Sequence, residues 1–474
     1  MEASIIQVLR SELSALASRS PSLAVACEPL LNRVQTPPRI VLVGRLKAGK
    51  STLLNALIGA EVAQTAALEA TNVVAAYKFG APEQAEFHLR NGSVIRVPTR
   101  RDEIAELPVP AAEIEFVDRY LSSDAVRPYT LIDTPGLATL TEENEAATRA
   151  MLTESFAQTR DASTDADAAV FLFDSIPRQD EVEFIRELGF TPLNTLGVLS
   201  RADSYGAGAL GAADPVDGAA RHAVRLEREL ARYVDRVIPV SGLLAQTATT
   251  GAVNEARTRR IATVTASSRV ALLELMYAQQ PDDPAQVREV AQVIDLIGEY
   301  GLFRGADAAA RGATALTNWL LEASGMNALR SALEGDLSSY AQLHRAGAII
   351  RSLDELAYQY PENAAEIRRS VSSIKRHPAA LPARLIVVLK TLQVAGASDE
   401  FIRETKLLAS CGSAASRLGL DPKAGVWEAL DTLREKRARM QTLAFGLLDP
   451  AEEEAMLAIN EAYDQLEREL SELL

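Results

Sequence analysis

The sequence has few of the residues that usually mark secreted or metal-binding proteins. Its 474 residues include only two cysteines, Cys27 and Cys411, which lie far apart in the chain. They imply no disulfide framework and suit a reducing cytosol. The four histidines show no metal-ligand spacing with one another or with the cysteines, and no G-x-S-x-G or Cys/His catalytic pattern is visible. Neither a disulfide-stabilised fold nor a histidine-based metal site is therefore expected.

Long hydrophobic runs are also lacking. The most apolar stretch, Leu385–Leu389, is far shorter than the ~20 residues that a helix needs to cross a bilayer. The first residues, Met-Glu-Ala-Ser, have neither the basic start nor the apolar core of a signal peptide. We therefore predict a cytoplasmic protein, which at most contacts the inner face of the cell membrane peripherally.

Positive charge is in deficit. The chain has 49 Lys and Arg against 64 Asp and Glu, so its formal net charge is −15. This balance disfavours nucleic acid as a partner, because a broad nucleic-acid-binding surface is basic. It also disfavours purely electrostatic adhesion to anionic lipid, although a local apolar loop could still insert.

The pattern of predicted helices and strands divides the chain into three parts. Residues 1–36 read as helices, because Ile5, Leu9, Leu13 and Leu16 recur at helical spacing. Strands and helices alternate over 37–253, which indicates an α/β domain with a mixed, mostly parallel sheet. The strand signal stops there, and 254–474 is helix-forming. We predict an all-α bundle built from both chain ends. The predicted strands are 39–43, 73–79, 85–89, 93–97, 112–117, 129–132, 168–173, 195–199 and 236–240.

The most informative motif is G-R-L-K-A-G-K-S, residues 44–51. It follows the apolar run Ile40–Val43 and precedes a helical pattern, and this strand–loop–helix context predicts a phosphate-binding P-loop. Lys50 is expected to reach the β- and γ-phosphates, and Ser51 to offer its hydroxyl to Mg²⁺. The residues expected to surround the phosphates are Gly44, Arg45, Lys47, Ala48, Gly49, Lys50, Ser51 and Thr52.

Two further segments are predicted to sense the γ-phosphate. Asp133-Thr134-Pro135-Gly136 follows a strand, where the acid can hold Mg²⁺ through water and Gly136 can contact the γ-phosphate. Thr71, between the P-loop helix and the next strand, is the candidate switch threonine that ligates Mg²⁺. Thr65 is an alternative in the same loop.

The base is predicted to be guanine. Ser200-Arg201-Ala202-Asp203 follows a strand at the place of the [T/N/S]-K-x-D motif. Asp203 can accept from guanine N1–H and the N2 amine, donors that adenine lacks. Arg201 replaces the usual lysine and can lay its stem or guanidinium plane over the base. Ser241-Gly242 occupies the place of the last guanine loop.

These residues resemble the bacterial dynamin-like GTPases, and most closely their actinobacterial isoniazid-inducible branch. The resemblance rests on residues 44–59, 70–74, 133–136, 171–188, 199–203 and 238–245, with 324–333 also similar. It implies a GTPase domain over 37–253, and a helical neck and shortened trunk formed from 1–36 and 254–474. It also implies Mg²⁺, GTP as substrate, GDP as product, and nucleotide-dependent dimerisation through the GTPase domains, often with membrane binding or remodelling.

Two departures from the family pattern concern catalysis and membrane contact. Lys47 stands where eukaryotic dynamins carry a serine, so Lys47 itself could supply positive charge in the transition state. No convincing membrane paddle is evident, and the best candidate, 378–394, reads more readily as a core helix. The chain resembles the shorter member of a dynamin-like pair, so its partner could be a second copy or a longer dynamin-like protein.

Two functions from different classes follow. The first is a GTPase enzyme in which Lys47, Lys50, Ser51 and Thr71 carry the chemistry. Leu137 stands where a catalytic glutamine could follow the DTPG motif, so the attacking water must be positioned by backbone or by a partner. The alternative is a weakly hydrolysing nucleotide-binding scaffold that regulates a longer partner. A translation GTPase is disfavoured by the acidic charge and the long helical tail, and a cassette ATPase by the lack of an L-S-G-G signature.

Overall fold

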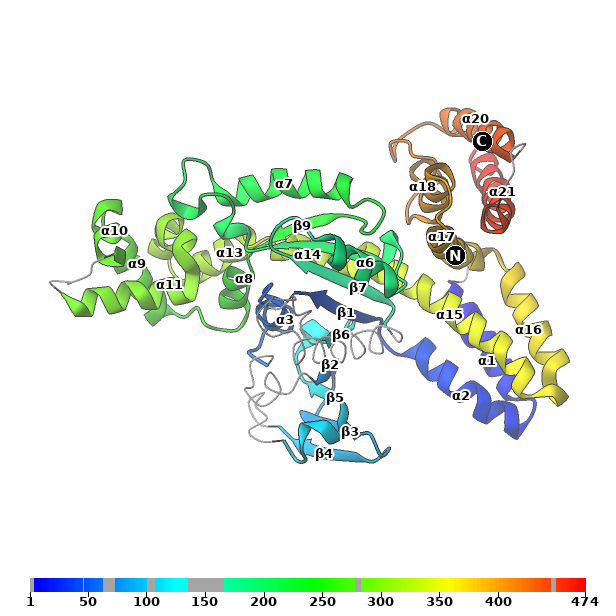
Figure 1. Cartoon of the computed structure of the whole chain (residues 1–474), viewed down its shortest axis with the longest axis horizontal. Helices are drawn as coiled ribbons and strands as arrows, with labels where there is room; N and C mark the ends of the chain where they lie inside the picture. Colours follow the sequence, from blue (N-terminus) through cyan, green and yellow to red (C-terminus); the bar gives the residue numbers. More distant parts are fainter. Residues whose placement is uncertain are drawn as a thin grey trace. The chain divides into compact units, whose positions relative to one another are not determined.

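The computed structural model describes residues 4–45, 47–62, 73–99, 107–134, 166–277, 283–444 and 449–474. The chain forms two compact units (Figure 1). The first comprises Met1–Pro38, Gly189–Asn194 and Asp336–Leu474, and the second comprises Arg39–Leu188 and Thr195–Gly335.

The second unit is organised around a nine-stranded mixed sheet of described residues, in the order β4-β3-β5-β2-β6-β1-β7-β8-β9. Strands β6, β1, β7, β8 and β9 are parallel neighbours, and β2 joins β6 antiparallel. Strands β7 and β8 are buried along their whole length, as continuous apolar strands in a sheet covered on both faces should be. All nine predicted strands are present. Their bounds are β1 Arg39–Gly44, β2 Val74–Phe79, β3 Gln84–Leu89, β4 Val94–Pro98, β5 Ile114–Leu121, β6 Thr130–Asp133, β7 Ala168–Phe173, β8 Thr195–Ser200 and β9 Val237–Val240.

The edge of this sheet beyond β2 consists of β5, β3 and β4. Strands β3 and β4 pair antiparallel around Asn91-Gly92, which confirms the predicted hairpin. Strand β5 then pairs with β3 antiparallel and with β2 parallel. Strand β3 alternates between part-buried and buried positions, as expected for a strand with one face on a small core.

In this unit, several helices follow the last strand, β9, in the chain. Residues of α8, α9, α11 and α13 bury one continuous cluster that includes Leu244, Ile261, Ile297 and Leu316. The helices described in this unit are α3 Lys50–Ile58, α6 Gln179–Glu187, α7 Pro215–Glu229, α8 Gly242–Thr249, α9 Glu255–Thr265, α10 Arg269–Tyr277, α11 Pro284–Arg304, α12 Ala306–Ala310, α13 Ala313–Ala323 and α14 Met326–Ala332.

The sequence predicts a domain boundary between residues 253 and 254, where the strand signal ends. In the structure, the boundary between the compact units lies between Gly335 and Asp336. Tertiary hydrogen bonds account for the difference. The Ser241 N–H donates to the Ser324 carbonyl at 2.9 Å, and the Arg330 guanidinium donates to the Ala56 carbonyl at 3.2 Å. These contacts tie helical residues after 253 to β9 and α3, and periodicity alone does not reveal such pairings.

In the other unit the two chain ends meet. Helices α1 (Ile5–Ala17) and α2 (Pro21–Gln35) pack against α15 (Ser338–Gln359), and α1 also packs against α16 (Ala364–Arg376) (Figure 1). The predicted stripe of Ile5, Leu9, Leu13 and Leu16 is buried in this cluster. The prediction that the N-terminal helix joins a bundle from the other chain end is therefore confirmed.

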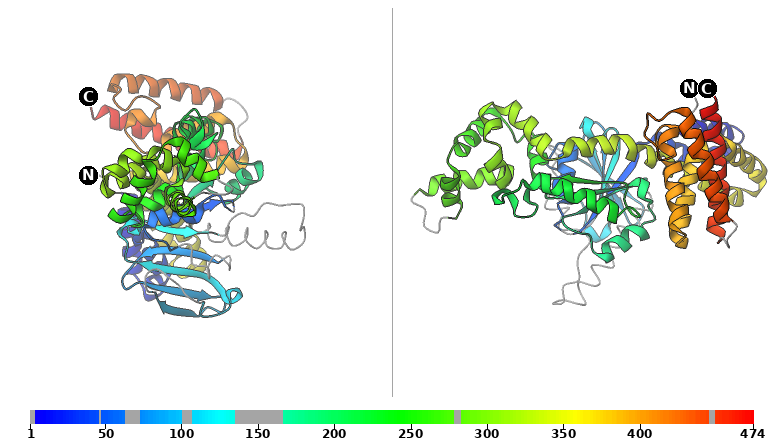
Figure 2. Two further views of the ribbon diagram at one scale, coloured as in Figure 1. Left: turned by 90° about the vertical axis from the view of Figure 1, so that its left-hand side faces the viewer. Right: turned by 90° about the horizontal axis from the view of Figure 1, so that it is seen from above.

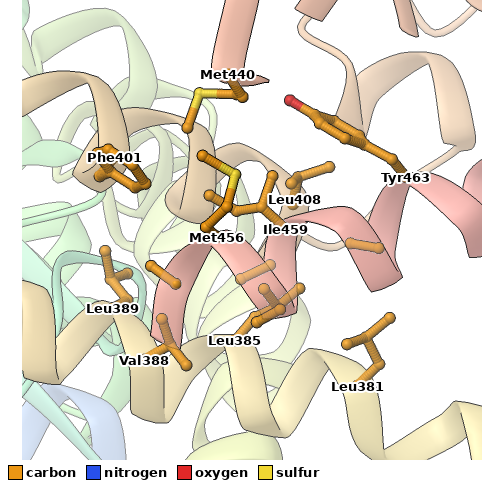
Figure 3. Close-up of a cluster of buried hydrophobic side chains, with 14 of the residues drawn as sticks. Leu381, Leu385, Val388, Leu389, Phe401, Leu408, Met440, Met456, Ile459 and Tyr463 are labelled. Carbon is orange, nitrogen blue, oxygen red and sulfur yellow. The ribbon is translucent and has the colours of Figure 1, made fainter. Parts of the chain in front are cut away.

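The remaining helices of this unit surround a second cluster, whose side chains Figure 3 shows converging from several helices. Helix α17 (Leu381–Ala395) contributes Leu385 and Leu389, α18 (Asp399–Ala409) contributes Phe401, and α21 (Pro450–Ser471) contributes Ile459. Helices α19 (Ala414–Arg417) and α20 (Val426–Ala444) complete this part, and α20 packs against α21. Figure 2 shows these C-terminal helices in orange and red.

One described helical stretch, Pro378–Ala395, is long and apolar enough to cross a membrane, and 44% of it is buried. It includes α17, which is the segment that the sequence singled out as a paddle candidate. The side chains of α17 that form its apolar stripe lie in the core with α18 and α21. Its hydrophobicity is thus accounted for by packing within the unit.

A buried arginine joins the two chain ends in this unit. The guanidinium of Arg345, 2% exposed, donates to the carbonyls of Arg33, Thr36 and Pro37, which close the C-terminal end of α2. We expect Arg345→Met to destabilise the protein by about 2–3 kcal/mol, because it removes three charge-assisted hydrogen bonds that hold the C-terminal end of α2. A urea titration followed by circular dichroism measures the shift. The matched control, Arg351→Met, alters an exposed arginine of the same helix and should leave the midpoint almost unchanged.

Candidate nucleotide-binding site

The P-loop connects β1 to α3. Gly49 has φ +94° and directly precedes the helix, so the chain turns into α3 through a left-handed residue that glycine adopts readily. Lys47 has φ +64°, which is uncommon for a residue with a side chain. The loop therefore holds a specific shape, and it ends at a helix N-terminus, whose N–H groups attract anions.

Lys50 is held across this loop. Its ammonium donates to the Gly44 carbonyl at 3.1 Å, and the residue is only 8% exposed. Burial lowers the pKa of Lys50 from its ordinary value, and the negative charge of Asp133 opposes that shift. A buried cation anchored to one carbonyl is well placed to exchange that partner for a phosphate oxygen.

Asp133 ends β6, where it lies in register with Leu42 of β1. The next residue, Thr134, is 4% exposed and donates its hydroxyl to the Leu42 carbonyl at 2.8 Å. This bond fixes the start of the DTPG segment beside the P-loop strand. Gly136, like Thr71 and its alternative Thr65, lies outside the described residues.

The predicted guanine motif lies at the end of β8. The Ser200 hydroxyl donates to the Phe173 carbonyl at 3.3 Å, and Arg201 turns the chain with φ +55°. The Arg201 guanidinium then donates to the Lys47 carbonyl at 2.7 Å. Lys47 and Arg201 are the two non-glycine residues with positive φ among those described, and this hydrogen bond joins them. The arginine that departs from the usual motif thus supports the unusual turn of the P-loop.

The last predicted loop also lies close by. The Ser241 hydroxyl caps α8 by accepting from the Leu244 N–H at 3.4 Å. A Cβ built on Gly242 would lie 3.3 Å from Thr52 of α3, so this loop and the P-loop helix approach closely. The structure therefore brings the described P-loop residues, Asp133, Arg201 and Ser241-Gly242 to the carboxyl ends of β1, β6, β8 and β9, where open α/β sheets bind ligands.

Two contacts in the site were not predicted from sequence. Arg45 forms an ion pair with Glu181, at 3.5 Å between Nε and Oε1, and Glu181 is 5% exposed. Gly298 interrupts α11 with φ +65° and ψ 177°, and a Cβ built there would lie 3.5 Å from the Asp203 carboxylate. The near-continuous helical pattern of 284–304 gives no signal of this break, whereas Glu181 lies within the stretch 171–188 that carries the family resemblance.

A separate polar cluster lies on strands β3 and β5. Glu86, His88 and Asp118 place one ligand atom each within 4.8 Å of one another, although their sequence spacing gives no hint of it. Both carboxylates already have cationic partners, since Lys78 lies 2.6 Å from Asp118 and Arg96 lies 2.7 Å from Glu86. A metal ion would have to displace these cations, so the cluster is accounted for as an ion-pair network.

We expect Arg201→Ala to raise the dissociation constants of GTP and GDP by similar factors of about 10. A charge-assisted hydrogen bond of this kind contributes roughly 1.5 kcal/mol, and it holds the loop that is expected to contact the phosphates of both nucleotides. Titration with each nucleotide tests this expectation, with the exposed Arg221→Ala as control. Unchanged affinities, or a loss confined to GTP, would show that the bond does not set the shape of the loop.

This site defines a class of protein. A P-loop with a buried lysine, an aspartate at the neighbouring strand end and an aspartate beyond β8 on a mixed α/β sheet are the features of GTP-binding P-loop proteins. The comparisons agree, because residues 39–194 match the family model of the 50S ribosome-binding GTPases.

Comparison over most of the chain narrows this class. The chain is 30% identical over 411 residues to the isoniazid-induced protein IniC of Mycobacterium tuberculosis, in strains CDC 1551 and H37Rv, and 82% of each protein is covered. It is also similar to a solved structure of an oligomerised bacterial dynamin pair, described as a mechanism for long-range sensing and tethering of membranes. That match has 15% identity and a TM-score of 0.31, and covers 98% of this chain and 75% of that one. The chain belongs to the family of IniC, the isoniazid-induced dynamin-like GTPases.

Proposed function

We propose that this protein hydrolyses GTP to GDP and phosphate in a Mg²⁺-dependent reaction that is coupled to dimerisation and to membrane association. The observation that carries the proposal is the hydrogen bond from Arg201 to the Lys47 carbonyl, which ties the predicted guanine loop to the P-loop. One nucleotide bound with its phosphates at Lys50 and its base at Asp203 would then contact both ends of a single connected structure.

The described residues have separate tasks in this proposal. The Lys50 ammonium neutralises the β- and γ-phosphates, and the N–H groups at the start of α3 hold the phosphate oxygens. Asp203 accepts from the guanine edge. Lys47 is exposed, and its carbonyl rather than its side chain makes the bond to Arg201, so its ammonium is available to stabilise charge that develops in the transition state.

The oxygen ligands at the site suit Mg²⁺. Ser51 brings its hydroxyl to the first turn of α3, and Asp133 lies close enough to Lys50 for its negative charge to oppose the lowering of that lysine's pKa by burial. Mg²⁺ prefers hydroxyl, carboxylate and phosphate oxygens and retains several waters. Ser51 and Thr71 would ligate it directly and Asp133 through water, and the ion would neutralise charge on the phosphates.

The absence of a catalytic glutamine after the DTPG motif is the reason for proposing dimerisation. Leu137 follows the DTPG motif where a glutamine could position water. A second GTPase domain, from another copy or from a longer dynamin-like partner, would complete the site when GTP is bound. The resemblance to the dynamin-like GTPases supports this part of the proposal, and with it peripheral contact with the inner face of the cell membrane and remodelling of that membrane.

The experiment measures phosphate release and particle mass on the same samples. We expect release from GTP and not from ATP, together with a larger mass by light scattering when GDP and aluminium fluoride mimic the transition state. GTP that binds without phosphate release would favour the alternative, a nucleotide-binding scaffold that regulates a longer partner. Hydrolysis without any change in mass would remove dimerisation from the proposal.

A further inference from the structure

Helix α16 presents a solvent face of one charge sign. Residues Arg368, Arg369, Lys375 and Arg376 are exposed, and with Ala365 and Ser372 they line a shallow depression along the helix. The opposite side, formed by Ile367, Val371 and Ile374, is buried against the bundle. The helix is therefore strongly amphipathic, with its cations gathered on the side that faces solvent.

The cations of this face are incompletely neutralised. Lys375 lies 3.2 Å from Asp354, and the only acidic residue of α16, Glu366, lies to one side and pairs with Arg19. In the part of the chain that the structure describes, Arg368, Arg369 and Arg376 form no ion pair with a carboxylate. Like charges one turn apart on a helix repel each other, so this arrangement is most favourable with an anionic partner.

An aromatic residue lies beside the face. The Arg368 guanidinium is 5.7 Å from the centre of the Tyr358 ring, and Tyr358 is 76% exposed. An exposed tyrosine next to arginine is a combination suited to a membrane–water boundary, where the ring enters the headgroup region and the cation meets phosphate.

We propose that this face of α16 is the surface through which the protein binds the phosphate headgroups of an anionic lipid bilayer. Four basic residues on an amphipathic helix are typical of such binding. The net charge of −15 disfavours electrostatic binding of the molecule as a whole to anionic lipid. Salt screens charges that lie farther from the bilayer than about one Debye length, so the basic α16 face can bind although the whole chain is acidic. The inference rests on the proposed membrane association and names the residues responsible for it.

The test is co-sedimentation of the full chain with vesicles of phosphatidylcholine alone, or with part of it replaced by phosphatidylglycerol. The test variant carries Arg368→Gln, Arg369→Gln and Arg376→Gln. The control carries Arg221→Gln, Arg225→Gln and Arg228→Gln on α7, which removes the same number of charges from exposed positions. The exposed side of α7 also carries Asp217 and Glu229, so it is not a face of one charge sign. Unchanged GTP binding and circular dichroism verify that both variants fold.

We expect the wild type to pellet with the anionic vesicles and to be released by salt. The α16 variant should partition roughly a hundredfold more weakly, since each basic residue near an anionic surface contributes about a fivefold factor, while the α7 control pellets as the wild type does. Equal loss in both variants would mean that net charge and not this face decides binding. Full binding by the α16 variant would overturn the inference and leave membrane association intact. A wild type that pellets with neither vesicle would overturn both.

Discussion

A Lys50→Ala variant is expected to lose GTP binding by a factor of at least about 100 and to show no GTP turnover above background. Lys50 is the buried cation of the P-loop, with its ammonium anchored to the Gly44 carbonyl. A charge-assisted contact to a phosphate contributes roughly 3 kcal/mol, and it is made in a partly dehydrated site where little else can replace it.

Loss of folding should not account for this result. Burial lowers the pKa of Lys50, so the unfolded chain holds this proton more tightly than the folded chain. The charged side chain therefore costs folding stability at neutral pH, and that cost disappears only as the pH rises toward the ordinary pKa of lysine. Removing the side chain relieves this cost, and we expect the melting temperature of the nucleotide-free variant to stay within a few degrees of the wild type.

The measurement is a nucleotide titration followed by a phosphate-release assay. Lys423→Ala, which removes an exposed lysine, serves as the matched control and should behave as the wild type. Retention of wild-type GTP affinity by Lys50→Ala would show that residues 44–51 do not bind the phosphates, and the proposed GTPase activity would then lose its foundation.

An Asp203→Asn variant is expected to change the base preference of the site. The carboxylate accepts two hydrogen bonds from guanine, and the amide can accept only one while offering a donor that guanine cannot satisfy. We expect GTP affinity to fall by about 100- to 1000-fold, and xanthosine triphosphate, which carries a carbonyl in place of the N2 amine, to bind at least as well as GTP does.

Competition between the two nucleotides measures the preference directly. The Asp307→Asn control removes an exposed carboxylate of α12 and should preserve selectivity for GTP. If Asp203→Asn weakened GTP and xanthosine triphosphate equally, Asp203 would support the fold of its loop and would not read the base. Lys50→Ala should weaken both nucleotides, so the two variants separate phosphate binding from base selection.

The predicted strands and the observed ones agree closely because each strand carries its own signal. The apolar runs of β1, β7 and β8 are buried on both faces, and Asn91-Gly92 encodes its hairpin locally. The P-loop was equally visible, since its glycines, lysine and serine lie within eight consecutive residues. The bundle of both chain ends was predictable from the stripe of α1, which needed a partner to cover it.

Other features could not be predicted because they depend on residues far apart in sequence. Arg201 was recognised as a departure from its motif, but its hydrogen bond to Lys47 spans 154 positions. The break of α11 at Gly298, beside Asp203, leaves the helical periodicity of that segment intact. All helices after 253 were assigned to the bundle, whereas those between 254 and 335 belong to the unit that contains the sheet, to which the hydrogen bonds of Ser324 and Arg330 tie them.

The sequence by itself determined the class of this protein: an α/β P-loop domain with guanine-binding motifs, joined to helices from both ends of the chain. Short motifs and hydrophobic periodicity indicate these features, and both are local properties of the chain. Only the tertiary structure decided which helices accompany the sheet, how the guanine loop supports the P-loop, and that α16 presents a face of one charge sign. Those outcomes depend on which faces are buried against which neighbours, and burial is a property of the packed molecule.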